Sequence, residues 1–451
     1  MPKNKKIRFT VTRPQKPDRK ALDDNLKQYS KSYNFSGKLE AQLPIDISKA
    51  QELVIGLDFG TAFTKIVIGS EVDAEALSFG KYGYLLPSQF YSDNGGNCSL
   101  YENGPNCFKD LKLPVLTRSA SLFDQVAIVC FLALVFKECR VWQKKSIYRS
   151  IDIDWLINSG LPTESYDEKV VVSLYRKVIN AAWICSFQNK INIRGCNQAI
   201  KNIEAKDFNY IGDYRLHSDC LNLFPEFAAQ IVGYVQSPSR RGFSHLLVDI
   251  GAGTIDVAMF IVSSTGGEWL FEITGKDIQT LGGDILAKHR MHHSKAVIDI
   301  REDFPTDVNF AQLLGVPLNT LKLIDKPFIS AVNSSLNKVV NSVALGHRFG
   351  EDITTFICGG GSKIKLYTDQ VEALKTKFPL QIIPLIKPDR LRNLDIHRDS
   401  YHRLSVAYGL SYDPLNIGKV TRKSVSLKQV INKRSQNKQA EIDRNREEMY
   451  K

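Results

Sequence analysis

Two short segments of this chain have nearly the same construction, and this internal repeat limits the possible folds more than any other feature. The segments span residues 53–69 and 245–262. In each, an apolar β-prone run ends in an aspartate, a glycine-containing turn follows, and a second apolar run leads away. Asp58 in the first segment aligns with Asp249 in the second, 191 residues later. A repeat at this spacing indicates duplicated domains rather than a short-period solenoid.

Both turns contain the residue types that bind a polyphosphate. Glycine and alanine allow backbone N–H groups to approach an anion closely, and a threonine hydroxyl or a lysine adds further contacts. The candidate phosphate-binding residues are Gly60, Thr61, Ala62 and Lys65 in the first segment, and Gly251, Ala252, Gly253 and Thr254 in the second. Asp58 and Asp249 have the right chemistry to hold Mg²⁺ through its water shell.

Three further segments complete a recognisable pattern. An apolar run ends in a third glycine turn, which contains Gly359, Gly360, Gly361 and Ser362. The other two segments begin at Leu223, just before Pro225, and at Ser405. In their order along the chain, the five segments resemble the actin, hexokinase and heat-shock chaperone ATPase superfamily, over about residues 53–410, and the resemblance implies that the segments after Pro225 and over residues 405–410 are helices.

This resemblance implies an α/β protein with a duplicated actin-like ATPase fold, also described as ribonuclease H-like, whose two lobes surround a nucleotide cleft. Lobe I is expected over residues 50–235, completed by residues 403–418, and lobe II over 236–402. Basic arms would occupy residues 1–49 and 419–451. Within lobe I, helical periodicity is visible over residues 126–140 and 165–187, with a strand at 155–161 between them.

The resemblance also assigns roles. The two repeated turns correspond to phosphate loops and Gly359–Ser362 to an adenosine loop, while Gly282 and Gly283 belong to a chaperone-like turn after the second phosphate loop. Asp58, Glu226 and Asp249 would be the catalytic residues, with Glu226 positioning the attacking water. The alternative for Glu226 is an ordinary acidic residue at a helix start, where the helix dipole favours it. ATP and Mg²⁺ are the expected ligands.

Within the superfamily the chain is closest to the nucleotide-binding domain of the seventy-kilodalton heat-shock chaperones, although Lys65 is actin-like. No acidic-apolar linker or β-rich substrate-binding domain follows Leu410. The resemblance therefore implies a slowly hydrolysing nucleotide switch that controls the binding of a protein partner. The alternatives are an ATP-dependent filament former and a small-molecule kinase.

Charge and cysteine content limit the setting. Residues 1–35 carry a net charge of +7 and residues 419–451 a net charge of +6, so the body between them is close to neutral against the formal +12 of the whole chain. The basic ends are expected to be flexible arms that either solubilise the protein or bind nucleic acid. The longest apolar run, residues 126–136, is too short to cross a membrane. Eight scattered cysteines without a CxxC pair favour reduced thiols and a cytoplasmic location.

Overall fold

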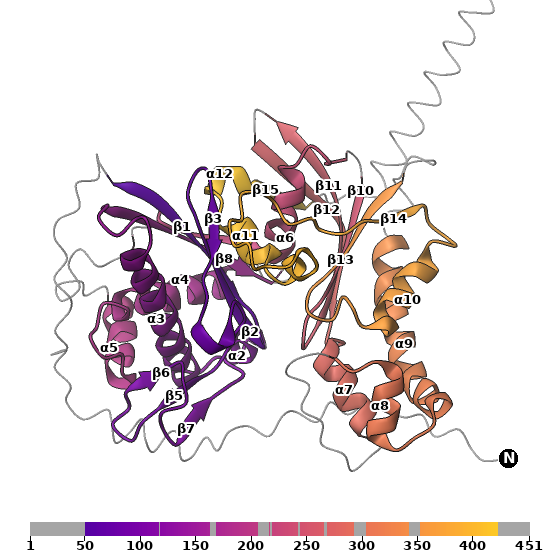
Figure 1. Ribbon diagram of the computed structural model, residues 1–451, viewed down its shortest axis with the longest axis horizontal. Coiled ribbons are helices and arrows are strands. Elements are labelled where there is room, and N and C mark those ends of the chain that lie inside the picture. Colours follow the sequence, from indigo (N-terminus) through magenta and orange to yellow (C-terminus); the bar gives the residue numbers. More distant parts are fainter. Residues whose placement is uncertain are drawn as a thin grey trace, which may run out of the picture. The chain divides into compact units, whose positions relative to one another are not determined.

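The computed structural model of the chain describes residues 50–116, 118–162, 168–205, 216, 219–241, 244–265, 268–292, 304–341 and 352–422. Helices and strands are both present along much of it, which confirms the predicted α/β class (Figure 1). The described residues fall into two compact units, a smaller one that includes Gln89–Lys137 and Lys177–Arg215 and a larger one that holds most of the remainder. The predicted N-terminal arm and residues 423–451 lie outside the described residues, and the lobe boundaries stay a prediction.

The larger unit contains two six-stranded sheets. The strands of the first sheet are β1 (Gln51–Phe59), β2 (Phe63–Gly69), β3 (Ala74–Ala76), β4 (Leu86–Pro87), β8 (Ile153–Leu161) and β9 (Leu221–Pro225). Their order is β3-β2-β1-β8-β9, with β4 paired to β2. β1 is antiparallel to β2 and parallel to β8. The predicted strand at residues 155–161 is thereby confirmed as part of β8.

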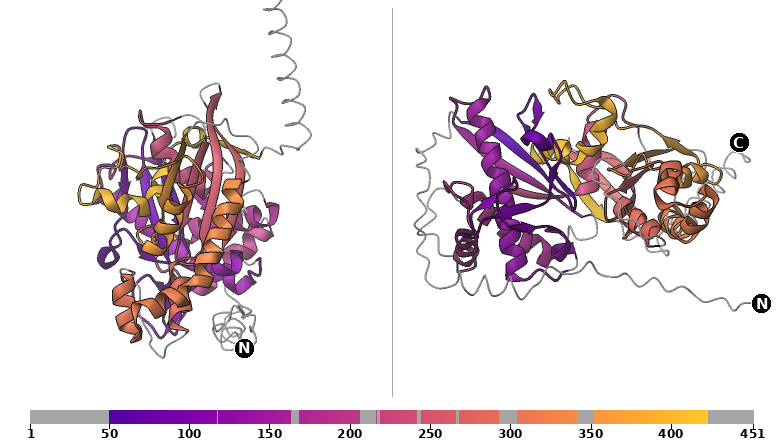
Figure 2. Two further views of the ribbon diagram at one scale, coloured as in Figure 1. Left: turned by 90° about the vertical axis from the view of Figure 1, so that its right-hand side faces the viewer. Right: turned by 60° about the horizontal axis from the view of Figure 1, so that its bottom comes forward.

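The second sheet repeats this arrangement. Its strands are β10 (Ser244–Ile250), β11 (Ile255–Thr265), β12 (Glu268–Gln279), β13 (Ile353–Cys358), β14 (Leu380–Ile382) and β15 (Lys419–Arg422). β12-β11-β10-β13-β14 has the same order and the same strand directions as β3-β2-β1-β8-β9. Both sheets can be followed in the two views of Figure 2.

One strand departs from the sequence prediction. Residues 419–422, which we expected to begin a flexible tail, form β15 and pair in parallel with β12, so that Leu270 lies opposite Lys419 and Ile273 opposite Arg422. Gly418 turns the chain into this strand with φ of +96°, a value that L side chains rarely adopt. Any tail therefore starts at least four residues later than predicted.

Two helices pack closely together in the larger unit. They are α6 (Glu226–Val235) and α11 (Ser405–Leu410), and both were predicted from the sequence. A Cβ added to Gly409 of α11 would lie 1.7 Å from the Ala229 carbonyl oxygen of α6, and one added to Gly56 of β1 would lie 2.1 Å from the Ala407 carbonyl oxygen. The two glycines therefore allow backbone-to-backbone packing that fixes α6 and α11 relative to β1.

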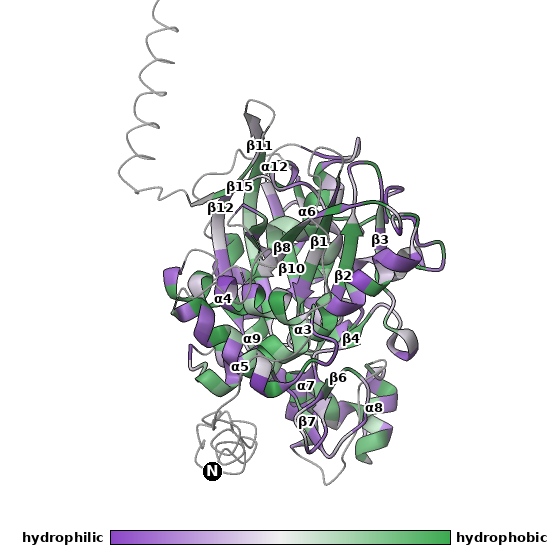
Figure 3. Ribbon diagram, turned by 90° about the vertical axis from the view of Figure 1, so that its left-hand side faces the viewer, coloured by the Kyte–Doolittle hydropathy of each residue, from purple (hydrophilic) through white to green (hydrophobic). Residues whose placement is uncertain are grey.

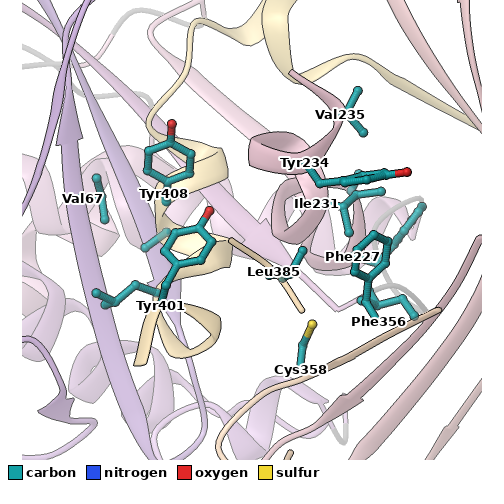
Figure 4. Packing of buried hydrophobic residues seen from close by; sticks show 14 of the residues in the cluster. Val67, Phe227, Ile231, Tyr234, Val235, Phe356, Cys358, Leu385, Tyr401 and Tyr408 are labelled. Atoms are coloured by element: carbon teal, nitrogen blue, oxygen red, sulfur yellow. The ribbon is translucent and has the colours of Figure 1, made fainter. Parts of the chain in front are cut away.

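The main core of the larger unit surrounds these helices. Figure 4 shows side chains from β2, α6, β13 and α11 pointing toward one another, including Val67, Phe227, Phe356 and Tyr408, and all four are buried. Phe227 lies with its ring centroid 5.4 Å from that of Phe260 on β11. The apolar residues along β1, β8 and β10 are visible as green strand segments in Figure 3. Burial of these aromatic side chains gives the core much of its hydrophobic stabilisation.

A second group of helices belongs to the second sheet. It comprises α7 (Gly283–Met291), α8 (Asp307–Leu314), α9 (Leu318–Asn341) and α10 (Lys365–Leu374); the short helix α12 (Pro414–Ile417) follows α11. The fully buried Arg290 joins three of these helices, because its guanidinium binds Asp325 of α9 with two bonds of 3.0 and 2.8 Å and Asp307 of α8 with one of 2.8 Å. Paired in this way, a buried cation can hold the helices together.

The smaller unit has a three-stranded sheet. Its elements are β5 (Phe90–Ser92), β6 (Cys98–Ser99), β7 (Asn106–Phe108), α2 (Leu113–Leu116) and α5 (Ile193–Glu204), while α3 (Leu122–Lys145) and α4 (Lys169–Cys185) each run from one unit into the other. The helices predicted at residues 126–140 and 165–187 are thus confirmed. Although residues 82–104 are rich in Gly, Asn and Ser, a composition typical of an exposed loop, they are packed in part, since Phe90 and Ser92 are buried.

All eight cysteines are free thiols, as the sequence predicts. Four of them gather in the smaller unit, where the thiol of Cys130 is within hydrogen-bonding reach of Cys98 and of Cys196, and Cys196 is within reach of Cys185. Burial raises the pKa of the Cys130 thiol well above its ordinary value. These thiols therefore stay protonated and act as small apolar packing groups.

Candidate functional site

The first repeated turn joins β1 to β2 in the larger unit. Asp58, near the end of β1, lies opposite Lys65 of β2, and Lys65 Nζ is 2.9 Å from Asp58 Oδ2. Asp58 is 6% exposed, so the carboxylate is almost withdrawn from water and has a cation as its partner. Gly60, Thr61 and Ala62 form the turn between the two strands.

A serine outside the repeat holds this turn in place. The Ser88 hydroxyl donates to the Gly60 carbonyl oxygen at 2.7 Å, and the Ser88 N–H donates to the Ala62 carbonyl oxygen at 2.8 Å. The Ser88 hydroxyl also lies 2.9 Å from the Thr64 hydroxyl. Within the described residues, the N–H groups of Thr61 and Ala62 donate to no backbone acceptor outside the regular ladders. The turn is therefore ordered through its carbonyl groups.

The second repeated turn joins β10 to β11 in the same way. Asp249 lies opposite Asp256 in the strand register, and the Gly251 N–H donates to the Thr254 carbonyl oxygen at 2.8 Å. A Cβ added to Gly253 would meet nothing within 4 Å, so this face of the turn is open. As in the first turn, the N–H groups of Ala252 and Gly253 donate to no backbone acceptor in the described part of the chain. Such amides suit an anion.

The chaperone-like turn predicted at Gly282 and Gly283 supports the second turn from its carbonyl side. The Gly283 N–H donates to the Gly251 carbonyl oxygen at 3.0 Å, and the Asp284 N–H donates to the Ala252 carbonyl oxygen at 2.8 Å. A Cβ on Gly282 would lie 2.4 Å from the same Ala252 oxygen. Gly282 is therefore needed for close packing of the two turns, and it orders the second turn much as Ser88 orders the first.

The third glycine turn lies against the end of β10. Gly359 has φ of +82°, and a Cβ at this position would lie 2.2 Å from Asp249 Oδ1. The Gly361 N–H donates to the Ile250 carbonyl oxygen at 2.8 Å, and the Ser362 N–H donates to the Gly359 carbonyl oxygen at 3.2 Å. Gly360 faces open space. The turn predicted as an adenosine loop thus adjoins the predicted catalytic aspartate.

Electrostatic coupling joins the two repeated turns. The pKa of Asp249 is raised from 3.8 to about 6, first by burial and then by the charge of Glu226, while Lys65 lowers it and Asp58 raises it. A charge that shifts a pKa typically lies within several ångströms of the titrating group, so the three predicted catalytic residues and Lys65 lie in one neighbourhood. A carboxyl group with a pKa near 6 is suited to accept a proton near neutral pH.

Glu226 enters this neighbourhood from the first residue of α6. Pro225 caps the helix with extended backbone, and the side chain of Glu226 passes so close to β8 that a Cβ on Gly160 would lie 2.8 Å from Glu226 Cγ. The glycine at the end of β8 therefore leaves room for Glu226, as Gly359 after β13 leaves room for Asp249. The position agrees with both interpretations of Glu226, the catalytic one and the helix-start one.

Two residues at the site were missed in the sequence analysis. Gln230, one turn after Glu226 on α6, acts on Asp249 as a polar side chain that lowers the pKa of the aspartate. Its spacing of four from Glu226 places it on the same helix face, so the sequence contained a usable signal. Ser88 gave no such signal, because its contact with the first turn depends on β4 pairing with β2.

The donor set fits a hydrated metal rather than a directly bound one. Among the described residues, no three histidine, cysteine, aspartate or glutamate side chains come together as metal ligands. Asp58 and Asp249 are two carboxylates in one neighbourhood, which suits Mg²⁺ because this ion keeps several waters and takes phosphate oxygens as further ligands. Gly253 and Gly360, with open space over both, leave room for a ligand beside them.

A separate cavity of about 370 Å³ shares none of these residues. It is lined in part by Ser70, Asp73, Trp142, Tyr148 and Arg392. Arg392 Nη2 lies 2.8 Å from Asp73 Oδ2, and the Trp142 indole N–H donates to Glu75 at 2.9 Å. The cavity is not part of the candidate site, because none of its lining residues belongs to that site. The ion pair and the hydrogen bond also satisfy polar groups of the cavity within the protein.

Comparisons of the sequence with protein-family models and with curated proteins give no match. In the part of the chain that the structure describes, no helix is both long enough and apolar enough to span a membrane.

Proposed function

We propose that this chain is an ATP-binding protein that hydrolyses ATP slowly and uses the nucleotide to control a protein partner. The proposal rests on one observation: an aspartate followed by a glycine-containing turn occurs at the equivalent place in each of two sheets that have the same strand order. The charge of Glu226 acts on Asp249, the aspartate of the second turn. We further propose that the two sheets are the halves of a duplicated actin-like ATPase fold of the heat-shock chaperone type.

The role of each turn follows from its hydrogen bonds. The carbonyl groups of both turns are engaged by Ser88 on one side and by Gly283 and Asp284 on the other. The N–H groups of Ala62 and Gly253, which donate to no backbone acceptor among the described turn and loop contacts, are then available to the β- and γ-phosphates of ATP. Lys65 adds a positive charge in the same neighbourhood. Held by Asp58 and Asp249 through water, Mg²⁺ would neutralise phosphate charge.

Chemistry is assigned to the acidic residues. Phosphoryl transfer needs mainly positioning and charge neutralisation from a protein. Glu226 would orient the attacking water, and Asp249 would accept its proton, which its pKa of about 6 allows. Removing the Glu226 carboxylate should therefore stop ATP hydrolysis while ATP still binds, because the proposed phosphate contacts come from the two repeated turns.

The test uses the purified full-length chain. ATP binding is measured by calorimetry with and without Mg²⁺, and hydrolysis by phosphate release. We expect Mg²⁺-dependent binding, slow turnover, and loss of turnover with retained affinity in Glu226→Ala. Failure of the parent protein to bind ATP would refute the proposal. If affinity and turnover disappeared together in Glu226→Ala, Glu226 would be the helix-start residue of the alternative interpretation.

A switch must also show reciprocity between its ligands. Partners are recovered from cell extract with the Glu226→Ala protein, and their affinity is measured in ATP and in ADP. We expect affinities that differ between the two nucleotides, because a ligand shifts a conformation only by binding one state better. Filaments that appear only with ATP in negative-stain images would favour the filament former instead, and phosphate on a small molecule would favour the kinase.

A further inference from the structure

Arg403 lies beside the first repeated turn, although it is far from that turn in the sequence. It ends the short 3₁₀ helix η3 (Arg398–Arg403), two residues before α11. Its guanidinium carbon lies over the ring of Phe63, 5.6 Å from the ring centroid. Phe63 begins β2 and directly follows Ala62, the last residue of the turn. The ring therefore holds a cation next to the proposed phosphate loop.

The alternation of side chains along β2 places Arg403 on the same face of the strand as Lys65. Alternate residues of a strand point to the same face, so Phe63, Lys65 and Val67 share one. Lys65 reaches the turn on this face, since a Cβ on Gly60 would lie 3.4 Å from Lys65 Nζ. Val67 packs in the core cluster that also contains the residue after Arg403. Two cationic side chains therefore border the turn from one side.

We propose that Arg403 binds the terminal phosphates of ATP as a second side-chain cation of the first turn. This inference rests on the proposed ATP-binding function. A guanidinium has five N–H donors in a fixed fork, so it can contact a ring of the protein and still bind phosphate oxygens in pairs. Held by Phe63, the guanidinium loses less freedom when the nucleotide binds than a mobile side chain would.

The charge of the first turn explains why a second cation is needed there. Lys65 is paired with Asp58 at 2.9 Å, so the two side chains together bring no net charge to the turn. Mg²⁺ offsets only part of the negative charge of a triphosphate. Arg403 adds a positive charge that persists over the whole physiological pH range. Its contribution to binding should therefore grow with the number of phosphates on the nucleotide.

The experiment measures binding of ATP, ADP and AMP by calorimetry to the full-length parent, Arg403→Gln, Arg403→Lys and the control Arg240→Gln. The Arg240 guanidinium lies 4.3 Å from the centroid of the Trp269 ring, and Trp269 pairs with Ser264 at the end of β11 remote from the second turn. We expect Arg403→Gln to weaken ATP binding by about 10- to 100-fold and AMP binding by about threefold or less, with ADP between them. Arg403→Lys should recover part of the ATP affinity, and the control should bind all three nucleotides like the parent.

The ring contact is tested by Phe63→Leu. This change should weaken ATP binding by about two- to fivefold in the parent. In the Arg403→Gln protein it should add little, because the guanidinium that the ring holds is already gone. Thermal unfolding without nucleotide identifies the folded variants. If Arg403→Gln does not fold, Arg403→Lys carries the test, since it keeps the charge and should still weaken ATP binding more than AMP binding.

Two outcomes would overturn the role of Arg403 and leave the ATP-binding function standing. One is parent-like ATP affinity in folded Arg403→Gln. The other is an equal loss of affinity for ATP and AMP, which would mean that Arg403 supports the fold rather than the phosphates. If the parent protein itself bound none of the three nucleotides, the proposed function would fail first and the role of Arg403 with it.

Discussion

The two repeated turns share a backbone plan but differ in electrostatics. Asp58 in the first turn is paired with Lys65 at 2.9 Å, so its charge is balanced within the protein. Asp249 in the second turn lies opposite Asp256 and beside Glu226, and burial raises its pKa to about 6. The comparison teaches that turns of the same backbone plan can differ in chemistry, because Lys65 pairs with Asp58 whereas burial and Glu226 act on Asp249. The first turn is suited to hold charge and the second to move a proton.

The largest expected difference is in turnover. Asp249→Asn should lower kcat for ATP by about a thousandfold or more, because it removes the proposed proton acceptor. Asp58→Asn should act mainly through the Mg²⁺ concentration needed for half-maximal activity. Steady-state phosphate release over a range of Mg²⁺ concentrations separates the two, with the exposed Asp369→Asn as control. Equal effects on kcat from both aspartates would remove the distinction between the turns.

The next largest expected effect is on stability, when the glycines beside Asp249 and Glu226 are replaced by alanine. Gly359→Ala combines φ of +82° with a contact of 2.2 Å to Asp249 and should cost about 3 kcal/mol or more of unfolding free energy. Gly160→Ala meets the flexible side chain of Glu226 at 2.8 Å, so it should cost about 1 kcal/mol or less while displacing Glu226 and slowing hydrolysis. Urea unfolding and ATPase assays measure both. A strongly destabilised Gly160→Ala would show that Glu226 cannot move.

Stability should change in opposite directions when each aspartate is neutralised. Native Asp249 binds its proton more tightly than the unfolded chain does, so the parent loses stability as pH rises from about 4 to about 6. Asp249→Asn escapes this loss and should be more stable above pH 6 by up to about 3 kcal/mol, with the gain vanishing near pH 4. Asp58→Asn removes the ion-pair partner of Lys65, so this variant should be less stable than the parent protein at neutral pH. Thermal unfolding from pH 4 to 8 without nucleotide tests both signs.

The smallest effect concerns Lys65. Its charge lowers the pKa of Asp249, so Lys65→Met should raise that pKa further. If deprotonated Asp249 is required, the acidic limb of kcat against pH should move upward by about one pH unit or less. The exposed Lys375→Met provides a control of equal charge change. A limb that stays in place would show that Lys65 acts only on Asp58 and on phosphate.

Features formed by residues close together in the sequence could be predicted from it, whereas contacts between distant residues could not. The aspartate–glycine turns were predictable because the same residue types recur at the same offsets, and the α6 start because Pro225 and Glu226 are ordinary N-terminal residues of a helix. The strand β15 was missed because Lys419–Arg422 contains one apolar residue and pairs only at a sheet edge. Contacts such as that of Ser88 with Gly60, or Arg290 with Asp325, join distant residues and leave no periodic signal.

The strand β15 determines where the C-terminal end of this protein can be truncated. β12 would be an edge strand along Leu270–Ile273 if the chain stopped at Gly418, and its exposed N–H and C=O groups would be a template for pairing with other molecules. A truncation at residue 418 would then report aggregation rather than the contribution of the basic tail. Stopping after Arg422 keeps the hydrogen-bonded edge and still removes residues 423–451, so salt-dependent nucleic-acid binding can be assigned to the tail without that artefact.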